Sequence, residues 1–450
     1  MFKKVDLVII GGGPAGYEAA FKAADGGMKA IIIEKEAIGG TCLNHGCIPT
    51  KTIMHSTELY KKLETIDEFG IALEKKSINF EVIQNRKEEI LEKLRNGILS
   101  RIRKSDIEVV LGEGKIVSNN LVRVGDETIE TKFILIATGT GTLLPPIKGC
   151  DLDGVITSDE LLEYNKKPFG ALTIIGGGVI GMEFANMFSD VGTSITVIEA
   201  LDRILPNMDK ELGQSLKMIL KKRGVDIHTS SFVEEIIKSN EGLSCKYKEK
   251  GKEAVVTSDA VLIAVGRKPN INNLYAADVE LEIEKGCIKV NDNYQTNYPN
   301  IYAVGDVIGG IQLAHVASAE GKNAVYHMLG KEDRIDVNVI PSCIYTNPEI
   351  ASVGITADDA KRENIKIIAN KFPMLANGKT ILSGMDRGYI KIIADEKSHK
   401  ILGAQMMCGR ATDLISELTV AIANELTLED LKKVIHPHPT FSEGIGDALN

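Results

Sequence analysis

The chain has 450 residues, of which 44% are hydrophobic and 26% charged, proportions typical of a soluble globular protein of about three domains. The net charge of -9, without a polybasic run, argues against binding to nucleic acid or to an anionic membrane. No apolar stretch approaches the ~20 residues of a membrane helix. Because the 7 cysteines are scattered and odd in number, they do not indicate a secreted disulfide framework, and we expect a cytoplasmic protein.

The first predicted elements are a buried strand, a glycine cluster and a helix, in the segment DLVIIGGGPAGYEAA. Gly11, Gly13 and Gly16 match the pattern GxGxxG, which allows a tight turn, a close approach of the backbone to a pyrophosphate, and packing of helix on strand. The helix N-terminus would offer free N–H groups to phosphate. Glu34 ends the next apolar run, where a carboxylate can bind ribose hydroxyls. Glycines after a strand often form only a turn, but strand, helix and acid together predict a dinucleotide site.

Two cysteines follow in GGTCLNHGCIPTK. Cys42 and Cys47 are five positions apart, which in a regular helix would separate their Cα atoms by about 8–9 Å. A disulfide needs less than about 7 Å, so a bonded pair requires an irregular backbone, which Gly46 would permit. Pro49 suits the first turn of the next helix, whose dipole, with Lys51, would favour a thiolate. The alternative is a pair of buried, inert cysteines.

A second unit repeats the first. After a charged helical stretch from Asn79 to Lys104 and a linker from Leu143 to Gly154, the segment LTIIGGGVIGMEFAN resembles the first glycine segment. Its glycines and the acid that follows keep the same spacing, and they are Gly176, Gly178, Gly181 and Glu199. The repeat predicts a second dinucleotide site. A carboxylate here would repel a 2′-phosphate and favours NAD over NADP, although the nearby Arg203 leaves NADP open.

The C-terminal segment HPHPTFSE holds a candidate general base. An imidazole can exchange a proton near neutral pH, and a carboxylate on its other nitrogen would fix its tautomer. His436 and His438 both meet this description, with Glu443 as the carboxylate, and the residues alone do not decide between them. The remaining cysteines show no metal-ligand spacing, so we predict no metal site.

The segment GGTCLNHGCIPTK is similar to the redox-active segment of the pyridine nucleotide-disulfide oxidoreductases, and within that family it most resembles the dihydrolipoyl dehydrogenases. The likeness covers essentially the whole chain. The other matching segments are GGGPAG, ATG (Ala137 to Gly139), GGGVIG, VGRKPN (Val265 to Asn270), AVGD (Ala303 to Asp306) and HPHPTFSE. His45 departs from the small apolar residue expected between the cysteines; we expect it to face solvent, the alternative being that it tunes the thiolate.

The resemblance implies an α/β fold with two Rossmann-like domains of the three-layer ββα type and an α+β interface domain. The FAD-binding domain would span 1–142 and be completed by 264–335. The NAD-binding domain would span 143–263, and the dimerisation domain 336–450. FAD and NAD are the expected cofactors and a homodimer the expected assembly.

The resemblance also assigns roles to residues. Cys42 would be the thiol that exchanges with substrate, and Cys47 the thiol next to the flavin. Lys51 would lie near the flavin N5 atom, paired with Glu183. Further cofactor contacts are expected from Thr138, Gly139, Gly266 and Asp306, the last of these at the ribityl chain.

His438 would be the base and Glu443 its partner, reaching the disulfide of the other subunit. The implied reaction is oxidation of a protein-bound dihydrolipoyl group with reduction of NAD. The group would arrive on a lipoyl-bearing domain of a 2-oxo acid dehydrogenase complex or on a glycine cleavage H protein. The alternatives are a glutathione- or mercuric-type reductase of the same family, or a mainly structural subunit of a multienzyme complex.

Overall fold

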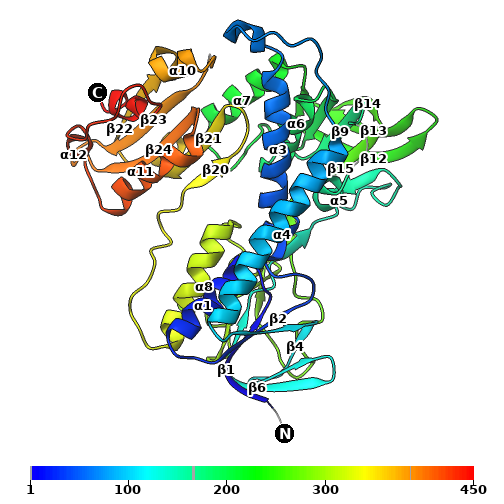
Figure 1. Cartoon of the computed structure of the whole chain (residues 1–450), viewed down its shortest axis with the longest axis vertical. Helices are drawn as coiled ribbons and strands as arrows, with labels where there is room; N and C mark the ends of the chain where they lie inside the picture. The colour runs from blue at the N-terminus through cyan, green and yellow to red at the C-terminus, as the bar shows by residue number, and fades with distance from the viewer. Residues whose placement is uncertain (1–2, 165–167, 386) are drawn as a thin grey trace.

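The structure is a computed structural model that describes residues 3–164, 168–385 and 387–450. It has an N-terminal unit, a middle unit and a C-terminal unit, and Figure 1 shows the first below and the other two side by side above it. The long helices α3 (Cys47–Lys62) and α4 (Phe80–Lys104) run from the lower unit up to the upper ones. Within the described ranges, no helix is both long and apolar enough to cross a membrane.

The N-terminal unit is built on a sheet of seven strands in the order β3-β2-β1-β6-β5-β4, with β19 pairing on β6. These strands are β1 (Lys3–Ile10), β2 (Ala30–Glu34), β3 (Glu108–Leu111), β4 (Gly114–Ser118), β5 (Leu121–Val124), β6 (Glu127–Ile136) and β19 (Ile301–Ala303). Both faces of β1 are buried, because Leu7 and Ile9 pack against one hydrophobic cluster and Val8 and Ile10 against another. This explains its continuous apolar sequence.

Helices cover one face of this sheet. α1 (Pro14–Asp25) packs against α8 (Ala314–Met328), which follows β19 in the chain. The two helices approach so closely that a Cβ on Gly321 would lie 2.5 Å from the carbonyl oxygen of Ala15. The unit also contains α2 (Gly40–Asn44) and η2 (Gly305–Ile308). The short helix η1 (Ile66–Phe69) follows α3 at the top of the molecule, where Phe69 lies near Gly384 (Figure 1).

The middle unit has three layers. Its parallel sheet has the order β11-β10-β9-β15-β8, and an antiparallel sheet, β12-β13-β14, covers one face. The strands are β8 (Val155–Thr157), β9 (Ala171–Ile175), β10 (Ser194–Glu199), β11 (Asp226–Thr229), β12 (Ser231–Ser239), β13 (Gly242–Glu249), β14 (Lys252–Ser258) and β15 (Ala260–Ile263). The helices α5 (Ser158–Leu162), α6 (Val179–Ser189) and α7 (Lys210–Lys222) complete the unit.

Alternation along β15 shows how the layers form: Ala260 and Leu262 pack in the same cluster as the helices, and Val261 and Ile263 pack against the antiparallel sheet. The segment 226–263 is antiparallel only over β12, β13 and β14. Its first and last strands, β11 and β15, belong to the parallel sheet.

The C-terminal unit is an antiparallel sheet in the order β20-β21-β24-β23-β22 with helices packed on it. Its strands are β20 (Ser342–Ile344), β21 (Glu349–Gly354), β22 (Ile367–Pro373), β23 (Tyr389–Asp395) and β24 (Ile401–Cys408). Its helices are α9 (Ala357–Arg362), η3 (Met374–Ala376), α10 (Gly378–Leu382), α11 (Ala411–Ala423), α12 (Leu428–Leu431) and α13 (Glu443–Asp447). Two small pairs complete the fold: β7 (Thr140–Thr142) with β16 (Arg267–Pro269), and β17 (Ile283–Glu284) with β18 (Cys287–Ile288).

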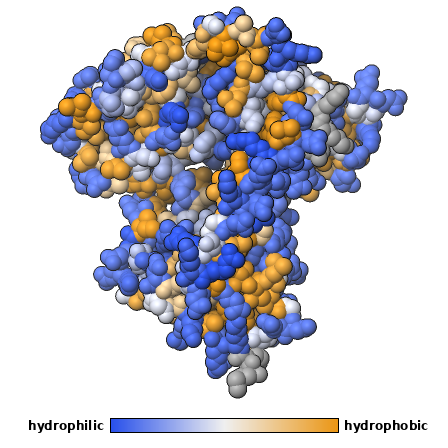
Figure 2. Space-filling model, in the orientation of Figure 1, coloured by the Kyte–Doolittle hydropathy of each residue, from blue (hydrophilic) through white to orange (hydrophobic). Residues whose placement is uncertain are grey.

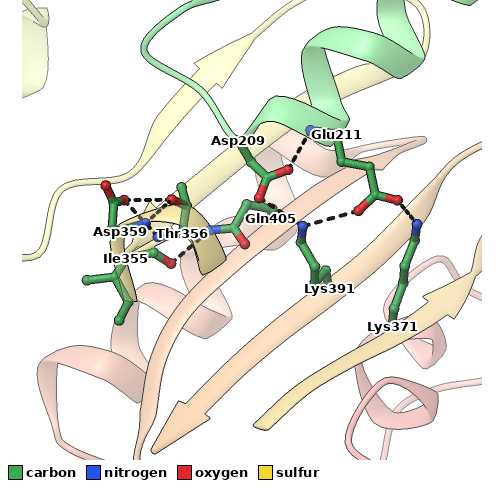
Figure 3. A network of polar contacts seen from close by, with 8 residues as sticks. All are labelled: Asp209, Glu211, Ile355, Thr356, Asp359, Lys371, Lys391 and Gln405. Atoms are coloured by element: carbon green, nitrogen blue, oxygen red, sulfur yellow. Dashed lines mark hydrogen bonds and ion pairs between the residues drawn. The ribbon is translucent and has the colours of Figure 1, made fainter. Parts of the chain in front are cut away.

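The predicted α/β class, with two Rossmann-like units and an α+β C-terminal unit, is confirmed. A polar network fixes the middle unit to the C-terminal one (Figure 3). Lys391 on β23 contacts Asp209, the N-cap of α7, at 2.8 Å, and Glu211 at 3.2 Å. Glu211 also pairs with Lys371 on β22.

Candidate active site

A cavity of about 1680 Å³ lies where the three units meet. Figure 2 shows the surface narrowed and hollowed between the lower unit and the two upper ones. Both glycine turns, both cysteines of the predicted pair, and residues of the C-terminal unit line it. The lining residues that the sequence predicted for the site are Gly11, Gly13, Glu34, Cys42, Cys47, Lys51, Thr138, Gly139, Gly176, Gly178, Glu183, Glu199, Gly266 and Asp306.

The first glycine turn leaves no room for a side chain at its first and third motif glycines, Gly11 and Gly16. A Cβ on Gly11 would lie 2.2 Å from the carbonyl oxygen of Ala137, and one on Gly16 would lie 1.9 Å from that of Gly11. Gly13 caps α1, whose N-terminus therefore points its free N–H groups at the cavity. Glu34 is buried and accepts the N–H of Gly12 at 2.7 Å and that of Glu36 at 2.9 Å. The acid thus holds the glycine turn, and its oxygens keep further lone pairs for a ligand.

The second glycine turn repeats this geometry. A Cβ on Gly176 would lie 2.3 Å from the carbonyl oxygen of Ala264, and one on Gly181 would lie 2.0 Å from that of Gly176. Glu199 accepts the N–H of Gly177 and, at 2.7 Å, that of Leu201. Arg203 is the residue whose position in the sequence left binding of NADP as an alternative to NAD. Its side chain donates a hydrogen bond to the carbonyl oxygen of Pro206 at 2.8 Å.

Cys42 and Cys47 meet at a break between two helices. Cys42 lies in α2, which ends at Asn44, and Cys47 is the first residue of α3. Gly46 between them has non-helical dihedrals, so the irregular backbone that close cysteines require is present. Both are free thiols, and each influences the acidity of the other. A covalent bond between the sulfurs stays a prediction.

The two thiols differ in acidity. The hydrogen bond from Cys42 lowers the pKa of Cys47 to about 7; burial opposes this effect, and the ammonium of Lys51 adds to it. The hydrogen bond to Cys47, together with burial, raises the pKa of Cys42 well above its ordinary value. The direction of the two pKa shifts favours Cys47 as the sulfur that carries negative charge when the pair is reduced.

Lys51 and Glu183 form an ion pair beside the cysteines, with 2.6 Å between Nζ and Oε2. Glu183 is buried, and its other oxygen accepts the N–H of Tyr345 at 3.0 Å. The Lys51 ammonium lies 4.7 Å from the centre of the Tyr345 ring. The predicted pair is present, and Tyr345 is a cavity residue that sequence reasoning missed. No local pattern could have found it, because the contact spans 162 positions.

Three cofactor candidates lie at the junction of the N-terminal and middle units. Thr138 has a buried hydroxyl without a hydrogen-bond partner among the described residues. Gly139 has φ of +63°, a left-handed conformation that favours glycine. Asp306 lies in η2 and accepts a hydrogen bond from the hydroxyl of Thr140 at 2.9 Å.

The two C-terminal histidines differ in their surroundings. His436 is largely buried, with 9% of its side chain exposed, and contacts Glu417 at 2.9 Å. His438 contacts Glu443 at 2.8 Å with 79% of its side chain exposed. The predicted pair is therefore present and accessible. Neither residue is among those that line the cavity of the same chain.

His45 was expected to face solvent, and 38% of its side chain is exposed. Its Nε2 lies 3.6 Å from Glu36, and it lines the cavity. The His45 side chain is therefore partly exposed to solvent and also lies near the Glu36 carboxylate.

Comparison with known proteins identifies the family. Residues 5–321 match the family model described as pyridine nucleotide-disulphide oxidoreductase, and residues 340–449 match the dimerisation domain of that family. The chain is a member of this family. It is therefore an FAD-dependent oxidoreductase, and FAD and NAD are its cofactors.

Full-length relatives agree with this assignment. A dihydrolipoyl dehydrogenase of Bacillus subtilis (strain 168) is 39% identical over 466 residues, covering 100% of this chain and 98% of that protein. One from Geobacillus stearothermophilus is 35% identical over 446 residues, covering 98% of this chain and 94% of that protein.

Solved structures are similar to this chain over nearly its whole length. LpdA from Mycobacterium tuberculosis has a TM-score of 0.92 at 25% identity, and 99% of each chain is covered. The HOCl-induced flavoprotein disulfide reductase RclA from Escherichia coli has a TM-score of 0.88 at 29% identity, with the same coverage.

Both cofactors fit features of this structure. Each glycine turn leaves an open approach to a helix N-terminus, and at Gly178 no atom lies within 4 Å of where a Cβ would stand. The cavity connects both turns with the cysteines. This arrangement suits two dinucleotides bound in one cavity.

Proposed function

We propose that this protein is a dihydrolipoyl dehydrogenase, which oxidises a protein-bound dihydrolipoyl group to lipoyl and reduces NAD. The observation that carries the proposal is the Cys42–Cys47 pair: two thiols whose pKa values shift in opposite directions, beside the Lys51–Glu183 ion pair, in a cavity shared by two glycine turns. The names of the full-length relatives support this substrate.

The exchange needs only the two cysteines of the chain and the two sulfurs of the substrate. A substrate thiolate attacks Cys42 of the disulfide, forming a mixed disulfide, and Cys47 leaves as a thiolate. The second substrate sulfur then attacks the first, displaces Cys42 and closes the lipoyl ring. The substrate loses two electrons and the cysteine pair gains them. The low pKa of Cys47 favours this direction, because a more acidic thiol leaves faster.

Cofactor binding is assigned to the residues around the two turns. Gly11, Gly13, Gly16 and Glu34 would hold the pyrophosphate and ribose of FAD, with Thr138, Gly139, Asp306 and Lys51 along the rest of the molecule. Gly176, Gly178, Gly181, Glu199 and Gly266 would hold NAD. When bound, the flavin and the nicotinamide accept the electron pair that the cysteines collect.

The general base is assigned to His438, held by Glu443. The carboxylate on Nδ1 leaves Nε2 to take the substrate proton. Because this pair is exposed and does not line the cavity of its own chain, we propose that it serves the cysteines of a second copy in a homodimer. The dimerisation domain at residues 340–449 contains both residues.

The substrate group would be carried by a partner, either a lipoyl-bearing domain of a 2-oxo acid dehydrogenase complex or a glycine cleavage H protein. A second candidate is an NAD(P)H-dependent disulfide reductase acting on another disulfide, which the likeness to RclA favours.

Steady-state assays separate these functions. The purified holoprotein is given dihydrolipoamide with NAD or with NADP, and separately NADH or NADPH with a panel of other disulfides. We expect rapid NAD reduction by dihydrolipoamide and a much slower reaction with NADP. Preferred reduction of another disulfide would favour the second candidate, and no NAD reduction at all would favour a structural role.

A further inference from the structure

Two segments far apart in the sequence bind each other at the edge of the cavity. The strand β7 pairs antiparallel with β16. Asn270 donates its side-chain amide to the carbonyl oxygen of Thr138 and its backbone N–H to that of Gly139, each at 3.0 Å. The segments ATGT and VGRKPN are therefore held together by hydrogen bonds.

Three side chains of this structure form a line of hydrogen bonds. Arg267 donates from Nε to the hydroxyl oxygen of Thr140 at 2.9 Å and from Nη2 to the carbonyl oxygen of Thr140 at 2.8 Å. The Thr140 hydroxyl contacts Asp306 Oδ2 at 2.9 Å. The direction is fixed by chemistry, because a guanidinium only donates and an ionised carboxylate only accepts. The hydroxyl must accept from Arg267 and donate to Asp306.

This line fixes one oxygen of Asp306 and leaves the other open. Thr140 is only 3% exposed, so its hydroxyl has little freedom to turn elsewhere. The Asp306 turn is held on its other side by Glu320, which accepts the N–H of Gly305 at 2.7 Å. Asp306 lines the cavity, and its Oδ1 has no hydrogen bond to any residue that the structure describes.

We propose that Thr140 and Arg267 are positioning residues that aim Asp306 at a hydroxyl of the flavin ribityl chain. The inference rests on the proposed role of Asp306 in FAD binding. Hydrogen bonds in a line polarise one another, so the guanidinium strengthens the bond from Thr140 to the carboxylate. A carboxylate already held in its binding orientation loses less freedom when the ligand arrives.

The test measures FAD affinity, from the rise of free-flavin fluorescence when full-length holoprotein is diluted. Thr140→Val removes the hydroxyl with little change of shape, and we expect FAD to bind about tenfold more weakly, as for loss of a hydrogen bond to a charged group. Thr140→Ser keeps the hydroxyl and should restore most of the affinity. Thr142→Val is the matched control, since that hydroxyl is on the same strand, buried, and without a partner among the described residues.

A double-mutant cycle shows whether the effect passes through Asp306. In an Asp306→Asn background, Thr140→Val should weaken FAD binding by less than about twofold, because coupled positions are not additive. A tenfold loss in both backgrounds would overturn the proposal that Thr140 acts through Asp306. Normal FAD affinity of Asp306→Asn alone would overturn it too, and would also remove Asp306 from the proposed cofactor site.

A second variant covers the case in which Thr140→Val does not fold, as judged by circular dichroism. Arg267→Lys breaks the same line at its other end, because lysine lacks the Nε donor and the planar fork. We expect weaker FAD binding that Asp306→Asn again masks. If the folded Arg267→Lys variant binds FAD with unchanged affinity, the proposed role of this line of hydrogen bonds is contradicted.

Discussion

Among single residues, Cys42 and Cys47 show most clearly that the fold sets the acidity of a side chain. The sequence predicts a thiolate near Lys51 and an irregular backbone at Gly46, and both are present. The resemblance implies that Cys47 is the charge-transfer thiol next to the flavin, but the residues alone do not show which sulfur carries the charge. That depends on the interaction between the two thiols, which the break between α2 and α3 allows. Tyr345 was missed for a similar reason, since it reaches Glu183 only through the tertiary fold.

The acidity of Cys47 provides a test at this scale. Cys42→Ala removes the main hydrogen bond to the thiolate, so the pKa of Cys47 should rise from about 7 toward the ordinary value of about 8.5. Less thiolate would then be present at neutral pH. Cys42→Ser keeps a donor and should keep the pKa low. The measurement is the pH dependence of Cys47 alkylation by iodoacetamide, read by mass spectrometry; an unchanged midpoint in Cys42→Ala would count against the hydrogen bond.

Helices and strands were predicted well where their signals are local. The strand, glycine turn and helix of both nucleotide units are present, and α4 begins after Asn79, whose side chain caps it. The contact between α7 and β23 could not be predicted. Lys391 and Asp209 are 182 positions apart, and neither is unusual in its own segment. Figure 3 shows that their pairing belongs to the junction of the middle and C-terminal units.

Lys391 should therefore be important for the stability of this junction. Lys391 and Asp209 have only 10% and 5% of their side chains exposed, so Lys391→Met leaves a buried carboxylate without its ion-pair partner. We expect the free energy of unfolding to fall by about 3–5 kcal/mol. Lys371→Met is the matched control: that side chain is 41% exposed, and we expect a loss below about 1 kcal/mol. Urea unfolding followed by circular dichroism compares them, and equal losses would contradict this account.

On the scale of the whole molecule, the resemblance predicted the fold class, the family and the cofactors correctly. The domain boundaries, the cytoplasmic location and the lipoyl-bearing partner stay predictions. The structure adds that the cysteines and His438 do not share one cavity within a chain. The resemblance already implied a homodimer in which His438 serves the other subunit, and this separation supports that proposal.

Subunit complementation tests the dimer directly. Cys42→Ser and His438→Ala should each lower turnover strongly, the latter by about 10²–10⁴-fold as for a lost general base. In a mixed dimer, the cysteines of the His438→Ala chain would meet the intact His438 of the other chain. We expect one working site per mixed dimer, measured as recovered turnover after the two variants are unfolded and refolded together. No recovery, with mixed dimers shown by mass spectrometry, would contradict a shared site.

The central claim, that Cys42 and Cys47 together accept the electron pair of the substrate, is tested by counting thiols in the denatured protein. The chain has 7 cysteines, so the oxidised protein should show two thiols fewer than this number. After anaerobic reaction with dihydrolipoamide it should show all 7. Cys42→Ser should give the same count before and after. A wild-type count that does not change with dihydrolipoamide would contradict the account.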